Sequence, residues 1–425
     1  MPEALAGDDY YRATSPGQSY ASLAGPVDAA VCIIGAGFAG LATAIGLMER
    51  GVQGIVLLDA QRVGHGASGR NGGFVFGGFS LGERSIAASI GAEAARGLYR
   101  MTLDAVERIA RRIDQYGIDC DVRHEGVYLA NWFDDARLLD ERQRFMMDVM
   151  GVEWQRVSRA QLAGKLDSTR YFGGLFEPAA FHFHPLKYAQ GLARVLAQNA
   201  VRVHEHSKVA SIAADGEGWI VTTKGGRVRA REVVVCCGGY IEKLHPRLSR
   251  AALPIATYVM VTEPLGERLQ TAMRTGAAVY DTRFAFDYYR PLADTRLLWG
   301  GRIAVRERSG LEVARLLQRD MLKVYPQLAG VRVAHAWSGM MSYARHQMPQ
   351  IGRLPDGLWY GMGFGGHGVA PTTLAGEVIA AAIAGDGGPL ARFAAWGLPS
   401  AGGHAGLAAA QMTYWYYELR DWMRQ

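Results

Sequence analysis

The sequence predicts an α/β protein with an α+β second domain, in which a parallel sheet covered by helices is interleaved with an antiparallel sheet. Three observations predict this organisation. A glycine-rich turn joins an apolar strand to a helix at residues 31–48. The run Val233–Cys237 is continuously apolar, which is typical of a parallel strand buried on both faces. Residues 256–335 contain runs rich in Phe, Tyr and Trp, which favour antiparallel strands.

The glycine-rich turn has the spacing of a dinucleotide-binding motif. The strand Val31–Ile34 is followed by Gly35, Gly37 and Gly40 at GxGxxG spacing, and Leu41–Met48 continues as a helix. The first glycine permits the tight turn, the second lets backbone approach a pyrophosphate, and the third lets helix and strand pack closely. The phosphates would lie at the helix N-terminus, where free N–H groups and the helix dipole favour negative charge.

An acidic residue follows at the position that this motif requires. The second strand, Ile55–Leu58, ends at Asp59, about 20 residues after the last glycine, where a dinucleotide fold needs an acceptor for ribose hydroxyls. Strand, turn, helix and acid together predict a Rossmann-like dinucleotide site, against the alternative of an ordinary strand–turn–helix with incidental glycines. A carboxylate here also disfavours the 2′-phosphate of NADP.

Composition excludes several classes of protein. The chain has 425 residues, enough for two or three structural units, and a net charge of only +6 without a long basic run, which argues against nucleic acid as a partner. Its four cysteines form no CxxC pair, so buried reduced thiols and a cytoplasmic location are expected. We find no signal peptide, and no apolar run approaches 18 residues, so no transmembrane helix is predicted.

A second glycine-rich loop, Gly64–Gly73, follows Asp59. It can lay its backbone against a flat ligand, while Ser68, Arg70 and Asn71 offer donors to phosphate or ring oxygens. The alternative is a flexible surface loop. Residues 1–28 before the first strand are predicted to form a loosely structured arm whose tyrosines, Tyr10, Tyr11 and Tyr20, pack on the body.

The middle of the chain reads as alternating helices and strands. Apolar spacing predicts helices within 84–117, 134–166 and 186–199, strands at 126–130, 201–203 and 209–212, and a hairpin of 219–223 with 227–230. His182 and His184 share one face of a short strand, but a metal site would need a third ligand and no nearby residue has convincing spacing. We therefore predict no metal. Gly238 and Gly239, after the buried strand, are expected to return to the cofactor.

The aromatic-rich region is predicted to be an inserted sheet. Strands are expected at 257–262, 284–290 and 296–302, followed by a helix at 311–324. Its aromatic side chains could wall a pocket, or could simply be the core of the sheet: Tyr258, Phe286, Tyr288, Tyr289 and Trp299.

The C-terminal part contains a third glycine-rich segment and an aromatic tail. Gly361, Gly363 and Gly366 again have GxGxxG spacing, but no strand ending in an acid follows. This segment is therefore not interpreted as a second nucleotide site. Instead, the N-terminus of the predicted helix 371–384 is expected to point at the cofactor. Residues 406–425 form an amphipathic tail that is expected to dock on the body, with a membrane-surface or dimer role as the alternative.

These motifs resemble those of a known superfamily. The GxGxxG start, the interrupted sheets and the glycine-rich returns near 238 and 363 resemble the FAD-dependent oxidoreductases of the D-amino-acid oxidase and sarcosine oxidase superfamily. Within it, the segments Gly66–Gly73, Asp287–Arg290 and Gly300–Arg302 are most similar to the γ-glutamylputrescine oxidoreductase branch. We assign 1–28 to the N-terminal arm, 29–118, 186–255 and 336–390 to the FAD-binding domain, 119–185 and 256–335 to the substrate domain, and 404–425 to a C-terminal amphipathic helix.

The resemblance implies a cofactor, a reaction and a set of site residues. It implies FAD and a substrate with a C–H bond next to an amine nitrogen, whose hydride passes to flavin N5 and whose imine product hydrolyses. It also places the histidine of the Gly-Gly-His-Gly segment, here His367, at the flavin, and we assign further catalytic roles to Arg302, as an anchor for a substrate carboxylate, and to Tyr258 and Tyr289. The residues expected to bind FAD are Gly35, Gly37, Phe38, Ala39, Gly40, Asp59, Ala60, Gly66, Ala67, Ser68, Arg70, Asn71, Gly72, Gly73, Val209, Cys237, Gly238, Gly339, Gly363, Gly365, Gly366, His367, Gly368 and Val369.

Two departures from sarcosine oxidases bear on the cofactor and on oxygen. Those oxidases attach their flavin through a cysteine near the segment that here reads Trp337–Tyr343, which has none, so noncovalent FAD is predicted. They also place a lysine beside N5, whereas no lysine occurs between Lys243 and Lys323. Reoxidation by O2 is the leading expectation. A dehydrogenase that passes electrons to a quinone or a protein, and a subunit with a structural flavin, stay open, as do the amine itself and a homodimer.

Overall fold

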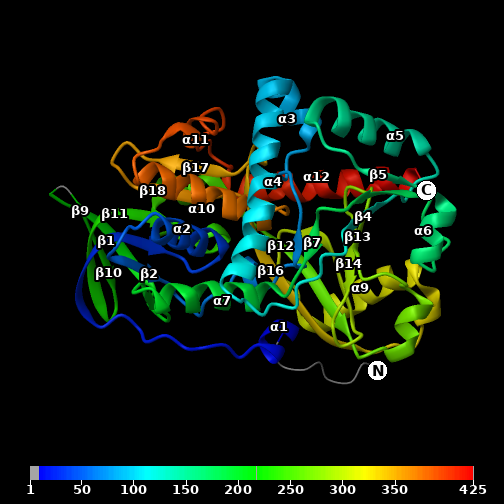
Figure 1. The fold of residues 1–425 in the computed structure, drawn as a ribbon, viewed down its shortest axis with the longest axis horizontal. Coiled ribbons are helices and arrows are strands. Elements are labelled where there is room, and N and C mark those ends of the chain that lie inside the picture. The colour runs from blue at the N-terminus through cyan, green and yellow to red at the C-terminus, as the bar shows by residue number, and fades with distance from the viewer. Residues whose placement is uncertain (1–8, 217, 425) are drawn as a thin grey trace.

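Two eight-stranded sheets lie side by side in the structure, a computed structural model that describes residues 9–216 and 218–424 (Figure 1). Residues 1–8 of the predicted arm lie outside the described residues. The first sheet consists of the parallel strands β8 (Arg202–His204), β2 (Ile55–Leu58), β1 (Gly25–Ile34), β11 (Gly226–Val235) and β18 (Trp359–Met362), in this spatial order, with β17 (Gln350–Arg353) antiparallel at the edge. In addition, β10 (Gly218–Thr223) pairs with β11, and β9 (Val209–Asp215) pairs with β10.

The order of the parallel strands is that of a Rossmann fold. Numbered along the chain, they lie in the order 3-2-1-4-5. Strands 2 and 3 are thus added on one side of β1 and strands 4 and 5 on the other, so the switch in strand order lies between β1 and β11. The predicted α/β class and the buried parallel strand at 233–237 are thus confirmed. The sequence predicts two strands at 227–230 and 233–237, but β11 is one strand, because its first half pairs with β10 while its whole length pairs with β1.

Helices cover the first sheet, and two of them are buried. The helices α2 (Phe38–Glu49) and α10 (Val369–Ile383) pack against each other so closely that a Cβ at Gly376 would lie 2.5 Å from the backbone of Ala42. Arg112 of α4 (Ala92–Gln115) joins them, because it donates 2.9 Å to Glu49 of α2 and also binds Glu377 of α10. The helix α7 (Pro185–Gln198) also packs on α2.

The second sheet is antiparallel except for one pair. Its strands lie in the order β16 (Val333–Ala344), β12 (Ala252–Thr262), β15 (Leu297–Ala304), β14 (Tyr288–Pro291), β13 (Ala278–Asp281), β4 (Val127–Ala130), β6 (Gly174–Glu177) and β5 (Gln155–Val157), and only β13 and β4 run parallel. The helix α9 (Gly310–Val324) packs on it. The predicted domain boundaries at 255/256 and 335/336 cut through β12 and β16. Because these strands pair along almost their whole length, both belong to the second sheet.

The remaining elements connect or cover the sheets. They are α1 (Tyr10–Thr14), β3 (Phe74–Val75), α3 (Glu83–Ile90), α5 (Ala136–Phe145), α6 (Arg159–Lys165), β7 (Phe181–His182), α8 (Pro246–Ala251), α11 (Gly388–Ala391) and α12 (Gly403–Met423), with single-turn segments at Ala67–Gly69, Met146–Met150, Gly238–Tyr240, Gly266–Thr271 and Pro326–Leu328. The continuous helical region predicted at 134–166 is wrong, since β5 interrupts it to pair with β6. Tyr10 and Tyr11 are buried and Tyr20 packs against the core, as predicted.

Candidate active site

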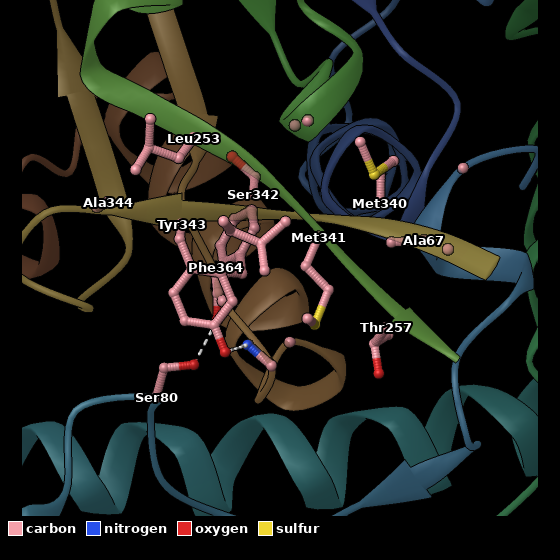
Figure 2. Close-up of a pocket in the computed structure, with 18 of the residues that line it drawn as sticks. Ala67, Ser80, Leu253, Thr257, Met340, Met341, Ser342, Tyr343, Ala344 and Phe364 are labelled. Carbon is pink, nitrogen blue, oxygen red and sulfur yellow. Dashed lines mark hydrogen bonds between the residues drawn. The ribbon is translucent and has the colours of Figure 1, made fainter. Parts of the chain in front are cut away.

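A cavity of about 1500 Å³ opens at the carboxyl ends of β1 and β11 and extends across to the second sheet. It is larger than the roughly 300–1,000 Å³ of an ordinary small-molecule site, so it has room for a dinucleotide and a second molecule. Its walls come from both glycine-rich loops, the loop 364–368, strands β12, β15 and β16, and the inner side of α12. Figure 2 shows β16 passing beside the loop that carries Phe364, with Met341 and Thr257 lining the cavity.

The GxGxxG turn forms the closed end of the cavity. Gly35 has φ +107°, and a Cβ there would lie 2.6 Å from the carbonyl of Cys236. A Cβ at Gly37 would lie 2.9 Å from Ser68 Oγ. Gly40 does not line the cavity, since its missing Cβ would lie 1.9 Å from the carbonyl of Gly35. It therefore serves helix–strand packing, as the third glycine of the motif should.

Asp59 is held in one orientation at the end of β2. Its Oδ2 accepts the N–H of Ala36 at 2.7 Å, and its Oδ1 accepts the N–H of Gln61 at 2.8 Å. Burial raises the pKa of this carboxyl, while the two N–H groups oppose the rise. The side chain faces the cavity beside Ala60, where an acceptor for ribose hydroxyls is needed.

The second glycine-rich loop is ordered by its own polar side chains. Ser68 Oγ accepts the N–H of Phe38 at 2.8 Å, at the start of α2. Asn71 donates to the carbonyl of Ser68 at 2.8 Å and accepts from the N–H of Gly73 at 2.8 Å. These bonds hold the loop along the cavity. Gly73 itself lies outside the cavity, because a Cβ there would meet the carbonyl of Phe183 at 2.1 Å.

The loop 364–368 is fixed by residues that the sequence did not single out. Tyr343 Oη accepts the N–H of Gly366 at 3.0 Å, and Ser80 donates 3.2 Å to the carbonyl of Phe364 (Figure 2). The carbonyl of Ser342 accepts the N–H of Gly365 at 2.7 Å. Gly363 lies outside the cavity, and its φ of +75° serves the turn that leads there. These partners are far from the loop in the sequence, so only the structure shows that they hold it.

His367 lies in the wall of the cavity. Its Nε2 donates 2.8 Å to the carbonyl of Gly77, and its ring meets Phe76 edge-to-face at 4.2 Å. Burial lowers the pKa of this histidine, so the ring is neutral at neutral pH. Its bond to Gly77 joins the loop before α10 to the segment after the second glycine-rich loop.

The predicted tyrosines Tyr258 and Tyr289 do not line the cavity. Tyr289 is fully buried, stacks on Trp299 at 4.2 Å and shares a hydrogen bond of 3.1 Å with Tyr171. Tyr258 donates 2.9 Å to the carbonyl of Arg306. Successive side chains of a strand point to opposite faces, so Tyr288 faces the cavity while its neighbour Tyr289 faces the core. A catalytic role for these two residues has no geometric support.

Arg302 reaches the cavity, but its guanidinium is already bound. It donates to both oxygens of Asp320, at 2.6 and 3.0 Å, and to Glu418 of α12 at 3.3 Å. Arg283, in the same region, binds Asp281 at 2.6 Å and Asp287 at 2.7 Å. The prediction that Arg302 anchors a substrate carboxylate is therefore wrong for this arrangement, because its guanidinium already links β15 to α9 and α12.

A third ion pair lies beside His367. Glu83 and Arg142 line the cavity and are 2.9 Å apart. Behind them, burial and the charge of Glu83 raise the pKa of Glu177 to about 8, while the N–H of Gly77 and Arg142 oppose the rise. One oxygen of Glu177 has no hydrogen-bond partner, so this carboxyl is protonated at neutral pH.

The residues fit FAD. The cavity offers the N-termini of α2 and α10, a carboxylate at Asp59, and a turn where Gly35 and Gly37 leave no room for side chains. Arg70 Nε is buried without a hydrogen-bond partner, although the side chain also donates 3.3 Å to the carbonyl of Ser338. A buried unpaired donor in a cavity wall indicates a bound acceptor. Among the residues described, no group of three His, Cys, Asp or Glu is placed to hold a metal.

The Rossmann-like sheet and the cavity lined by its glycine-rich loops define a class of FAD-binding oxidoreductase, and sequence comparison agrees. The profile of the FAD dependent oxidoreductase (DAO) family matches residues 30–382, so the chain belongs to this family. This confirms the superfamily to which the motifs point.

Particular relatives narrow the position within the family. The chain is 36% identical to gamma-glutamylputrescine oxidoreductase of Escherichia coli (strain K12), over 92% of each chain, and 33% identical to the probable oxidoreductase OrdL of Haemophilus influenzae, over 92% and 91%. The fold of glycine oxidase from Geobacillus kaustophilus superimposes with a TM-score of 0.72 at 18% identity, over 88% of this chain and 99% of that chain. The L-proline dehydrogenase of P.horikoshii gives 0.69 at 16%, over 84% and 94%.

Gly37→Val should weaken FAD binding about a hundredfold, because the added side chain would fill the cavity beside Ser68. A steric cost of about 3 kcal/mol corresponds to about a hundredfold weaker Kd. Titration of the apoprotein with FAD, followed by absorbance, measures this. Gly387→Val is the control, since Gly387 is exposed and has open space around it. A Gly37 variant that purifies fully yellow would contradict the assignment of this turn to the cofactor.

Glu177→Gln should stabilise the protein at high pH. The folded-state pKa of about 8 lies above the value near 4.5 in the unfolded chain, so the folded state holds the proton more tightly and stability falls as pH rises between these values. Gln cannot ionise, and it should gain roughly 3 to 5 kcal/mol over the native protein at pH about 9 but less than about 1 kcal/mol at pH about 5.

Denaturant unfolding of both proteins at the two pH values measures this difference. Glu107→Gln, at an exposed position of α4, is the control and should change stability little and equally at both. A Glu177→Gln variant whose stability relative to the native protein does not depend on pH would show that the buried carboxyl is ionised throughout.

Proposed function

We propose that this protein oxidises the C–N bond of an amine with noncovalent FAD and releases an imine that hydrolyses in water. The observation that carries the proposal is the 36% identity, over 92% of the chain, to a gamma-glutamylputrescine oxidoreductase. When bound, FAD supplies the acceptor for a hydride, at N5. The protein supplies binding, orientation and exclusion of water.

The cofactor would extend along the whole cavity. Asp59 is the acceptor for ribose hydroxyls, and the turn around Gly37 receives the pyrophosphate at the N-terminus of α2. The flavin ring would lie between the second glycine-rich loop and the loop that ends at Gly368, where the N-terminus of α10 favours electron-rich ring oxygens. Noncovalent attachment is supported by the absence of cysteine from Trp337–Tyr343.

The charges of the cavity wall favour an amine without a required carboxylate. At the end of the cavity away from the GxGxxG turn, Arg142, Arg283 and Arg302 are each already paired with a carboxylate of the protein, whereas the lining residues Arg70, in the second glycine-rich loop, and Arg345, which is exposed, have no such partner among the residues that the structure describes. A substrate carboxylate would have to displace such a buried partner, which costs several kcal/mol per ion. An uncharged or cationic amine makes no such demand. Phe286 and Tyr288 add apolar surface that suits an extended aliphatic or aromatic chain.

His367 is proposed to position the flavin-side loop rather than to transfer a proton. Its neutral ring and its bond to Gly77 hold the start of α10 against the segment that follows the second glycine-rich loop. A displacement of about 1 Å at this place is enough to cost roughly a hundredfold in rate.

The electron acceptor is proposed to be O2, in a cytoplasmic enzyme. A dehydrogenase that uses a quinone is the second candidate, because no lysine from the inserted sheet is available to activate oxygen and because α12 presents exposed aromatic side chains beside the cavity.

An anaerobic absorbance scan with a panel of amines and N-substituted amino acids tests the proposed function. An amine without a carboxylate should bleach the flavin band, and admitting air should restore it within seconds if O2 is the acceptor. Acid precipitation should release the FAD into the supernatant. Bleaching by amino acids alone would contradict the amine assignment, and a yellow protein that no compound bleaches would favour a structural flavin.

His367→Ala should lower the rate constant of anaerobic flavin reduction by about 10- to 100-fold, because the loop before α10 loses its bond to Gly77. His367→Gln is the matched control, since its amide can still donate to that carbonyl and should keep most of the rate. Stopped-flow reduction at saturating substrate measures both. Equal loss in both variants would instead indicate a direct chemical role for the imidazole.

A further inference from the structure

The outer side of α12 exposes an unusual amount of apolar surface. Eleven large hydrophobic residues are exposed in the described part of the chain, and six of them lie on this one helix. Each is more than half exposed, and Trp422 reaches 68%. They are Met412, Trp415, Tyr416, Leu419, Trp422 and Met423. An exposed apolar patch of this kind marks an interaction site.

The six side chains form one continuous stripe. Their spacing of three and four residues places them on one face of the helix over about 16 Å of its length. The opposite face is used within the molecule: Tyr417 stacks on Phe284 at 4.4 Å, and Tyr414 is buried. The helix therefore has two apolar faces, of which one docks on the body and the other, the stripe, points away from it.

The charges of α12 are sorted between these faces. Glu418 pairs with Arg302 at 3.3 Å, and Asp421 is buried and accepts the N–H of Phe284 at 2.7 Å. Both carboxylates thus bind groups of the body, although the side chain of Glu418 is still 44% exposed. Arg420 and Arg424 are exposed, and their guanidinium groups lie over the rings of Tyr417 at 4.7 Å and Phe133 at 4.5 Å. One flank of the stripe therefore carries two exposed arginines.

We propose that the stripe and its two arginines bind the protein peripherally to an anionic lipid bilayer. Trp and Tyr prefer the boundary between lipid and water, and a helix with Trp, Leu and Met on one face and arginines beside it is typical of a segment that lies in this boundary. No helix in the described residues is long and apolar enough to cross a membrane, so α12 would lie along the surface.

Charge selects this occupant over a second copy of the chain. The exposed arginines next to the stripe, Arg420 and Arg424, are attracted by an anionic surface, whereas the same face of a second copy presents like charges to them. Each arginine near such a surface contributes about 1 kcal/mol, or about fivefold in affinity.

Docking through the stripe would bring the bilayer close to the cavity. The inner side of α12 lines the cavity with Ala405, Ala409 and Thr413. A helix is about 10 Å across, so the lipid boundary would lie about that far from the cavity wall. The proposal does not depend on which amine is oxidised.

Sedimentation of the FAD-loaded full chain with lipid vesicles tests the proposal. The protein should bind vesicles of phosphatidylcholine mixed with phosphatidylglycerol, bind those of phosphatidylcholine alone at least tenfold more weakly, and dissociate as salt rises. Trp415→Ser with Leu419→Ser and Trp422→Ser should lower the partition coefficient at least tenfold. Arg420→Gln with Arg424→Gln should lower it by about fivefold per arginine.

A matched variant separates the stripe from general surface hydrophobicity. Met147→Ser with Leu311→Ser removes exposed apolar side chains elsewhere and should bind vesicles as the native protein does. Brominated lipid should quench tryptophan fluorescence in the native protein more than in the triple-serine variant. Flavin absorbance confirms that each variant is folded.

Three results would overturn the proposal. One is a native protein that does not bind phosphatidylglycerol vesicles at low salt. Another is a triple-serine variant that binds them as tightly as the native protein. The third is a native dimer, seen by analytical ultracentrifugation, that the triple-serine variant converts to a monomer while vesicle binding stays absent. That outcome would assign the stripe to a second copy.

Discussion

The close approach of β1, β11 and α2 is the constraint on which the rest of the structure depends. Around Gly35 and Gly40 the backbones touch without side chains between them, since a Cβ at either position would overlap a carbonyl. This contact fixes the start of α2 and the carboxyl ends of the two strands at one point. Because the sheet reverses order there, the opening becomes a cavity rather than a packed core. The second glycine-rich loop and the N-terminus of α10 reach the same point from far along the chain.

Internal charge pairing shapes the other end of the cavity. Arg142, Arg283 and Arg302 all face it; Arg142 and Arg302 are bound by carboxylates of neighbouring helices, and Arg283 by Asp281 and Asp287 of its own segment. Burying such a charge alone would be costly, and pairing offsets most of this cost. The guanidinium groups of Arg142 and Arg302 therefore link separate elements, α5 to α3 and β15 to α9. Behind this part of the wall, Glu177 is neutral through its raised pKa.

The C-terminal helix links this wall to the surface of the molecule. Through Glu418 and Asp421 it is fastened to Arg302 and to the backbone of Phe284, so its inner face completes the cavity. Its outer face carries no such contacts and keeps its tryptophans exposed. The helix α12 thus lies between the cavity and the exposed stripe on the molecular surface.

By itself the sequence determined the α/β class, the family, and most of the cofactor cradle, because these depend on spacing along the chain. The glycines, Asp59 and the buried strand at 233–237 are local patterns with one physical explanation each. Only the tertiary structure decided which aromatic and charged side chains reach the cavity. The sequence shows that neighbouring side chains of a strand point to opposite faces, but not which face is the cavity. Only the structure shows that Tyr288 lines the cavity and Tyr289 lies in the core. The partner of Arg302 comes from α9, and the ion pair beside His367 joins α3 to α5. Such contacts between distant segments leave no local pattern, because they are set by how the elements pack.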